Sequence, residues 1–283
     1  MLFLILSIIF SVTVGAIFKL VRGHSTSIPQ VVATNYLFAL LLCYFFFNPD
    51  LTAVGVEAPW RIYISLGVLL PTIFLFLVAS IKHVGIVKTD AAQRLSLFIP
   101  ILAAWLIFGE KFNGLKISAL LIAFPALLFI LTKPSESTKN KWIYSAVVLV
   151  GFGLIDILFK QIALYTELPY ITSLFVVFLL ALTIMTAVVS FELGFKKVKL
   201  DYKNLFFGAL VGLFNFGNIF FYLKAHQSFA DNPSTVFAGM NMGVIIVGSL
   251  TGIIVFKEKL SKMNFVGLFL ALIAIVLIVI SQQ

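Results

Sequence analysis

The sequence predicts an all-α integral membrane protein whose ten transmembrane helices form two inverted five-helix repeats. The first observation is composition: 61% of the 283 residues are hydrophobic and only 11% are charged. A soluble fold cannot bury so much apolar surface, because most of any protein surface must meet water. The second is the length of the apolar segments, and the third is a recurrence of short motifs. Together they exclude a soluble enzyme, a nucleic-acid-binding protein and a disordered scaffold.

Ten apolar segments have the roughly 20 residues that a helix needs to cross a bilayer. We expect them at 2–21, 27–47, 60–81, 87–108, 113–132, 141–161, 170–190, 203–225, 233–256 and 262–281. The segments are continuously apolar and lack the alternation of barrel strands, which favours helices. No positively charged region precedes the first segment, so we expect a retained span rather than a cleaved signal peptide.

Prolines mark several helix boundaries and bends. The sequences Ser-Ile-Pro at 27–29 and Asp-Asn-Pro at 231–233 predict helix starts, each with a capping side chain before a proline in the first turn. Pro71, Pro100 and Pro125 lie inside predicted helices. Each removes a backbone donor and is therefore expected to bend its helix and free a carbonyl.

A polar connection at 132–141 divides the chain into two halves, 1–133 and 134–283, with five spans each. Phe-Gly-Glu-Lys-Phe at 108–112 recurs as Phe-Lys-Glu-Lys-Leu at 256–260, and Ile-Phe-Lys at 17–19 matches Leu-Phe-Lys at 158–160. Matches near both ends of each half, in the same order, predict a duplication. An odd number of spans inverts the second half in the membrane and places a substrate site near the midplane between the halves.

The distribution of charge indicates a membrane topology. The net charge is +9, and lysines and arginines concentrate in the first, third, fifth, seventh and ninth connections. The positive-inside rule then places these connections in the cytoplasm and both termini outside. The single cysteine, Cys43, excludes an intrachain disulfide and a cysteine metal cluster.

Two short motifs carry a family resemblance. Gly-Glu-Lys at 109–111 and Lys-Glu-Lys at 257–259 each precede an apolar segment that contains a glycine, and Gly-Ala-Ile-Phe-Lys lies at 15–19. Over essentially its whole length the chain resembles the drug/metabolite transporter superfamily, and more narrowly its EamA-like ten-span exporters. It departs from their pattern in the second motif, where Lys257 stands at the position that Gly109 has in the first motif. The resemblance implies export of an amino acid or similar metabolite across the plasma or inner membrane.

Ionisable side chains inside the predicted spans are candidate substrate-binding residues, because polar groups at bilayer depth are costly. Asp156 is the clearest candidate, and it precedes Lys160 by one helical turn, so that the two can pair along one helix face. Asp156 either contacts a substrate ammonium or carries a proton during transport. The alternative is a structural ion pair. Its repeat equivalent is Gly15, which would make the site asymmetric.

Amides and one tyrosine provide further candidates. Gln93 and Asn241 are equivalent in the two halves and could bind a polar metabolite, or alternatively join neighbouring helices by hydrogen bonds. Asn215, Asn218 and Tyr222 follow an i, i+3, i+7 spacing, which predicts one water-facing helix wall.

Arg94 and Asn35 complete the candidate substrate-binding set. Arg94 either meets a carboxylate or phosphate of the substrate or extends to the membrane interface. Asn35, in the second span, is a further amide of the kind described above.

Other charged residues border the spans, and we interpret them as structural. Lys19 and Lys160 lie near helix ends, where their side chains are expected to extend to water. Glu110 is expected to form a local salt bridge or a helix cap. His83 and His226 are expected to be solvated at the interface.

No catalytic or nucleotide-binding motif occurs, so we expect no enzyme activity, no cofactor and no metal site. The sequence predicts a secondary transporter that exports a small metabolite, such as an amino acid, by alternating access. Its expected partners are that metabolite, the lipid bilayer and a proton as coupling ion, with no nucleic acid; facilitated diffusion is an equal alternative, as are monomer and homodimer. The second hypothesis is a non-transporting polytopic scaffold or lipid-binding protein, whose polar residues pair off and leave no aqueous cavity.

Overall fold

The computed structural model describes residues 1–21, 27–83, 86–131, 142–195, 198–257 and 261–281. This part of the chain forms eleven α-helices and no strand. They are α1 (Leu2–Val21), α2 (Ile28–Phe47), α3 (Trp60–His83), α4 (Ile86–Leu95), α5 (Phe98–Leu106), α6 (Gly114–Leu131), α7 (Trp142–Leu164), α8 (Tyr170–Phe195), α9 (Tyr202–Ser228), α10 (Pro233–Ile254) and α11 (Lys262–Ile280). The predicted boundary between the two halves, at 133 and 134, lies outside the described residues.

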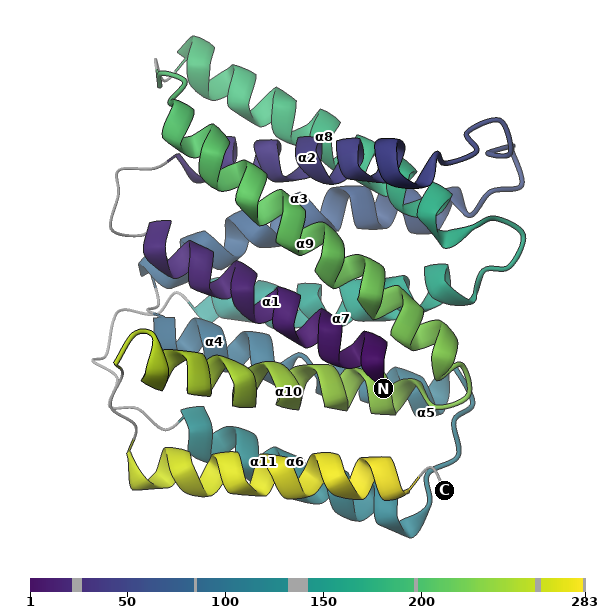
Figure 1. Ribbon diagram of the computed structural model, residues 1–283, viewed down its shortest axis with the longest axis vertical. Helices are drawn as coiled ribbons and strands as arrows, with labels where there is room; N and C mark the ends of the chain where they lie inside the picture. Colours follow the sequence, from purple (N-terminus) through teal and green to yellow (C-terminus); the bar gives the residue numbers. More distant parts are fainter. Residues whose placement is uncertain (22–26, 84–85, 132–141, 196–197, 258–260, 282–283) are drawn as a thin grey trace.

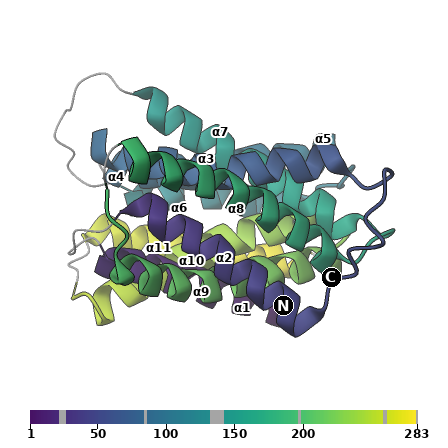
Figure 2. The same ribbon diagram turned by 90° about the horizontal axis from the view of Figure 1, so that it is seen from above.

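Among the described residues, eight helices are long and apolar enough to cross a membrane: α1, α2, α3, α7, α8, α9, α10 and α11. Shorter apolar stretches lie at 92–106 and 114–126. The helices run broadly along one direction, with their connections at two opposite ends of the bundle (Figures 1 and 2). The chain is therefore an all-helical, multi-pass membrane protein, as the fold class predicted.

Both ends of the chain lie at the same end of the bundle, where α1 begins and α11 ends (Figure 1). We call this the terminal end. The connections at 48–59, 107–113, 165–169 and 229–232 share it. Successive long helices therefore alternate in direction, as a chain that crosses a membrane repeatedly requires.

The predicted helix at 87–108 is wrong as one continuous element, because α4 ends at Leu95 and α5 begins at Phe98. Pro100 explains the break: it has no N–H to donate to the Ser96 carbonyl four residues earlier, and its ring crowds that carbonyl. The Ile99 amide donates to the Ser96 carbonyl at 3.0 Å instead. The Ser96 hydroxyl donates to the Gln93 carbonyl at 2.6 Å. By contrast, Pro71 and Pro125 lie inside continuous helices.

Helix α9 crosses α1 and α2, and two glycines set its distance from α2. A Cβ atom added at Gly208 would lie 2.8 Å from the Val31 carbonyl oxygen, and one at Gly212 would lie 2.8 Å from the Asn35 carbonyl oxygen. Two backbones this close leave no room for a side chain between them. Glycines spaced by four residues are a common means of close helix packing in membranes.

We expect Gly212→Ala to lower the free energy of unfolding by about 1–3 kcal/mol, because the new methyl group overpacks the contact with α2. Thermal unfolding in detergent measures the effect. Gly15→Ala is the matched control, since a Cβ there meets nothing within 4 Å. Equal destabilisation by the two substitutions would contradict this account of the α2–α9 contact.

Candidate functional site

A cavity of about 190 Å³ lies inside the bundle, between helices from both halves of the sequence. Its polar lining residues are Ser11, Tyr36, Gln93, Arg94, Ser96, Asp156, Asn215, Asn218, Tyr222 and Asn241. Its apolar lining residues are Leu70, Ile73, Phe74, Phe152, Ile155, Phe159, Ile219, Met240 and Val244. Polar side chains that hydrocarbon could not satisfy thus converge on one internal space.

The cavity lies well inside the helices. At 1.5 Å per residue, Tyr222 is about 9 Å from the end of α9 at Ser228, and Asp156 is about 12 Å from the end of α7 at Leu164. Both of these helix ends are at the terminal end of the bundle (Figure 1). From the lining residues Phe152 and Asn215, α7 and α9 extend about 15 Å and about 20 Å further toward the opposite end.

Helix α9 provides one wall of the cavity through Asn215, Asn218 and Tyr222. Each side chain is oriented by a neighbour on another helix. The Asn215 amide nitrogen donates to Asn35 Oδ1 at 3.1 Å, and Asn218 Oδ1 accepts from the Ser7 hydroxyl at 2.8 Å. These bonds hold the amides in place while leaving polar atoms to line the cavity.

Asp156 and Lys160 belong to different networks, although they share a face of α7. Asp156 Oδ1 accepts a hydrogen bond from the Tyr222 hydroxyl at 2.9 Å. The Lys160 ammonium instead donates to the carbonyls of Ala230 at 2.8 Å and His226 at 3.4 Å. Instead of pairing with each other as predicted, Asp156 bonds to Tyr222 at the cavity, and Lys160 bonds to backbone carbonyls at the end of α9.

The break between α4 and α5 positions the polar residues of the first half. Gln93, Arg94 and Ser96 lie at or beside the break, and all three line the cavity. Asn241 lines it from α10, where its side-chain amide donates to the carbonyl of Phe237 on the same helix at 3.1 Å. The two amides expected to be equivalent therefore lie on the wall of the same cavity.

Of the eight predicted substrate-binding residues, only Asn35 does not line this cavity. It is buried behind Asn215, to which it is hydrogen bonded. Sequence reasoning missed Ser11 and Tyr36 as lining residues. A signal for Ser11 was present, because Ser7 precedes it by one turn on a largely apolar helix.

A second cluster of charged residues is buried at the terminal end. The Lys116 ammonium lies 2.5 Å from Glu110 Oε1 and donates to Asn232 Oδ1 at 2.9 Å. Glu110 also accepts from the amide of Ser234 at 2.8 Å and from its hydroxyl at 2.6 Å. Glu110 thus forms a salt bridge and a helix cap, but the interactions are not local: the cation is Lys116 on α6 and the capped helix is α10, 124 residues further along the chain.

Two expectations at this end are wrong. Lys160 was expected to extend to water and His226 to be solvated, yet both side chains are fully buried. Neither ring nitrogen of His226 has a hydrogen-bond partner. Their position near the ends of the apolar segments suggested an interface location, but the connection between α9 and α10 folds over them.

The predicted helix starts at Ile28 and Pro233 are confirmed, but the predicted side-chain caps are not. Ser27 makes no side-chain cap, and Asn232 instead accepts from Lys116. The first turn of α10 is capped from outside its own helix, by Glu110.

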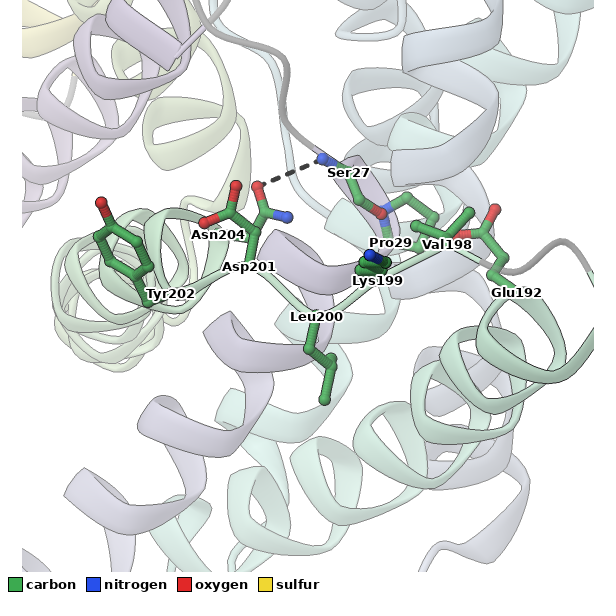
Figure 3. A pocket seen from close by; sticks show the side chains of 9 residues that line it. All are labelled: Ser27, Pro29, Glu192, Val198, Lys199, Leu200, Asp201, Tyr202 and Asn204. Carbon is green, nitrogen blue, oxygen red and sulfur yellow. Dashed lines mark hydrogen bonds between the residues drawn. The ribbon is translucent and has the colours of Figure 1, made fainter.

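A larger, open hollow of about 760 Å³ lies where α2 begins and the α8–α9 connection ends (Figure 3). Its lining residues are Ser27, Pro29, Glu192, Val198, Lys199, Leu200, Asp201, Tyr202 and Asn204. Gln30 Nε2 of α2 donates to the Lys199 carbonyl of this connection at 2.9 Å, and the Ser27 amide, just before α2, donates to Asn204 Oδ1 in the first turn of α9 at 3.2 Å. We therefore treat the hollow as a surface recess and the internal cavity as the candidate site. In the described part of the chain, no group of three or more His, Cys, Asp or Glu is placed to hold a metal ion.

Comparison with known proteins gives a relative and a shared fold. No family model matches the chain. An uncharacterised protein of Haemophilus influenzae strain Rd is 42% identical over 282 residues, which cover 96% of this chain and 95% of that protein. A solved crystal structure matches with a TM-score of 0.75 over 99% of this chain and 96% of the other chain, at 12% identity. At that identity the match shows the fold alone.

The buried pair Glu110–Lys116 gives a test of how charge is held at the terminal end. Lys116→Met is expected to lower the free energy of unfolding by about 3–5 kcal/mol, because it leaves a buried carboxylate without its counter-ion. The double variant Glu110→Gln with Lys116→Met removes both charges and is expected to cost much less. A thermodynamic cycle of the wild type, the two single variants and the double variant measures the coupling. Additive effects of the two substitutions would contradict a coupled pair.

Proposed function

The chain belongs to the same family as the Haemophilus influenzae protein, and we propose that it is a secondary transporter that exports a small metabolite such as an amino acid. The observation that carries the proposal is the internal cavity lined by Gln93 and Arg94 from the first half and by Asp156, Tyr222 and Asn241 from the second. Polar side chains from both halves thus face one space between membrane helices instead of packing against apolar neighbours. Polar and ionisable groups facing such a space mark substrate or ion pathways.

The side chains that line the cavity support a small ligand that carries one positive and one negative group. Asp156 offers a carboxylate for an ammonium group, and Arg94 offers a guanidinium for a carboxylate or phosphate. Phe74, Phe152 and Phe159 provide an apolar surface beside them. The volume of about 190 Å³ is below the roughly 300–1,000 Å³ of sites for drug-sized ligands. An amino acid meets these requirements better than a lipid or a large drug.

We further propose that the chain spans the membrane ten times as two inverted five-helix repeats, with α4 and α5 together forming one broken span. The packing of helix pairs supports this. Under exchange of the two halves, the contact of α1 with α9 corresponds to that of α7 with α3, and the contact of α2 with α9 to that of α8 with α3. Likewise α1–α10 corresponds to α7 with α4 and α5, while α2–α8 and α6–α11 each map onto themselves.

Local geometry at equivalent positions supports the same repeat. Gly109 has φ of 66°, and Lys257, its counterpart in the recurring motif, has φ of 53°. Left-handed backbone is costly for a residue with a side chain, so its recurrence at a lysine indicates a turn that both halves require. Asn113 caps α6 by accepting from the Lys116 amide, and Ser261 caps α11 by accepting from the Asn264 amide.

We propose that the chain is an EamA-like member of the drug/metabolite transporter superfamily, and these features support that proposal. A broken helix beside the cavity is typical of secondary transporters, because irregular backbone inside a membrane is tolerated where it lines a cavity. In the proposed mechanism the halves rock about the cavity, which opens to each side in turn. The distribution of lysine and arginine supports termini outside the plasma or inner membrane. A proton on Asp156 is the proposed coupling ion, and facilitated diffusion is the alternative.

The second hypothesis, a scaffold without transport, requires the internal polar residues to satisfy one another and leave no cavity. Several do pair, such as Asn35 with Asn215 and Ser7 with Asn218. However, polar residues from both halves also line a shared space. The cavity therefore favours transport over the scaffold.

Uptake and efflux of radiolabelled amino acids and other small metabolites by proteoliposomes test the function. Asp156→Asn is expected to reduce flux at least about tenfold, because an amide cannot neutralise a substrate ammonium or carry the coupling proton. Asp50→Asn, in the exposed connection 48–59, is the matched control and should retain wild-type flux. Elution and circular dichroism report folding. If the wild type moves no compound in a broad panel, the transporter proposal fails in favour of the scaffold.

A further inference from the structure

The connection between α9 and α10, residues 229–232, is held by three buried charged side chains at the terminal end of the bundle. They are Glu110, Lys116 and Lys160, and we call them the turn clamp. Glu110 precedes α6 and Lys116 lies on it, so both come from the first half of the sequence, whereas Lys160 lies on α7. One short turn is thus fastened from both halves.

The clamp grips the turn by its backbone on both sides. Lys160 donates to the carbonyl of His226, in the last turn of α9, and to the carbonyl of Ala230 in the turn itself. Glu110 accepts from the amide of Ser234 in the first turn of α10. A cation at a helix C-terminus and an anion at a helix N-terminus are both favoured by the helix dipoles. The charges of Lys160 and Glu110 are therefore matched to the helix ends that they contact.

Aromatic rings pack between the cavity residue Tyr222 and the clamped turn. Tyr222 lines the cavity, and His226, one turn further along α9, is fully buried with its ring 4.6 Å from the ring of Tyr222. Phe237 of α10 packs on the other side of His226, at 4.8 Å between ring centroids. Since His226 has no hydrogen-bond partner, its burial is costly and must be enforced by the surrounding packing.

The opposite end of the bundle is packed more loosely along α1 and α10. A Cβ added at Gly239 or Gly243 would collide with Leu4 or Ile8 of α1. Further from the terminal end, a Cβ at Gly248 would only reach Val12 at 4.0 Å, and one at Gly15 would meet nothing within 4 Å. Helices α1 and α10 therefore fit tightly at the terminal end and separate toward the other end.

The two lysines at equivalent positions of the proposed repeats also differ in burial between the two ends of the bundle. Lys160, near the terminal end, is fully buried against carbonyls. Lys19, its counterpart near the opposite end, is exposed, with its ammonium 3.9 Å from the ring centroid of Phe256. If the halves exchange conformations during transport, the environment of each lysine changes to that of the other.

We propose that the turn clamp is a latch that keeps the cavity closed toward the terminal end, and that its release lets α9 and the start of α10 move away from Glu110 and Lys160. This inference rests on the proposed function. The structure is then the state closed at the terminal end. Opening that end breaks the contacts of Glu110 with Ser234, of Lys116 with Asn232 and of Lys160 with Ala230.

Access of a thiol reagent to the cavity tests the latch without a known substrate. In a Cys43→Ser background, Ser11→Cys places a single thiol on the cavity wall. The protein is reconstituted into vesicles, and an N-terminal tag that protease can remove identifies the side on which the termini lie. A charged, membrane-impermeant methanethiosulfonate is then added from one side at a time, and the rate of modification is measured.

Two variants release the clamp in different ways: Lys160→Met, and Glu110→Gln combined with Lys116→Met, which removes both charges of the Glu110–Lys116 pair together. Both are expected to raise the modification rate from the side of the termini about tenfold or more, and to lower it from the opposite side, because the population shifts between two states. Lys111→Met, at an exposed position in the same connection as Glu110, is the matched control and should behave as the wild type.

Three results would overturn the latch: unchanged rates from the side of the termini in both variants, equal increases from both sides, or no modification in any variant. The second would indicate loosened packing rather than a shift between two states. Elution and circular dichroism of each variant show whether it is folded. The thiol assay contains no metabolite, so its result does not depend on flux. If the variants change thiol access as expected but the wild type shows no flux, the transporter proposal fails and the latch does not.

Discussion

Hydrocarbon offers no hydrogen-bond partner, and this constraint organises the whole structure. Each helix satisfies its own backbone, so the chain is almost entirely helical wherever it is described. Side chains that need a partner can find one only between helices. The amides of α9 accordingly bond to Ser7 on α1 and Asn35 on α2, and Asp156 bonds to Tyr222. The remaining polar atoms gather around one internal space, which is the candidate site.

The same constraint explains where the backbone is irregular. Pro100 prevents the Ser96 carbonyl from receiving its usual helical donor, and in lipid the free carbonyl would be costly. At the break the hydrogen bond spans three residues instead of four, so that the amide of Ile99 donates to the Ser96 carbonyl. Ser96 also lines the cavity, where polar groups can be accommodated. The break between α4 and α5 is thus tolerated inside the membrane because it lies at the wall of the cavity.

Features that depend on neighbouring residues could be predicted from the sequence, whereas features that depend on contacts between distant segments could not. Apolar length and helix-boundary prolines predicted most helices to within about five residues, since both act locally, but not the division of the segment 87–108 into α4 and α5. The polar residues of α9 were found because their spacing places them on one helix face. The burial of Lys160 and His226 could not be predicted, because it depends on a turn that folds over them. The cap of α10 was likewise invisible, since Glu110 is far away in the sequence.

The differences between the proposed repeats matter as much as their likeness. A symmetric pair would form a symmetric site, but Asp156, the carboxylate among the described lining residues, has Gly15 as its counterpart. The buried Lys160 and the exposed Lys19 extend this difference from the site to the two ends of the bundle. In an inverted duplication, two ends in different environments describe one state of a molecule whose other state exchanges them. The residues that differ between the halves can therefore bind the ligand, while those that match can alternate between the two environments.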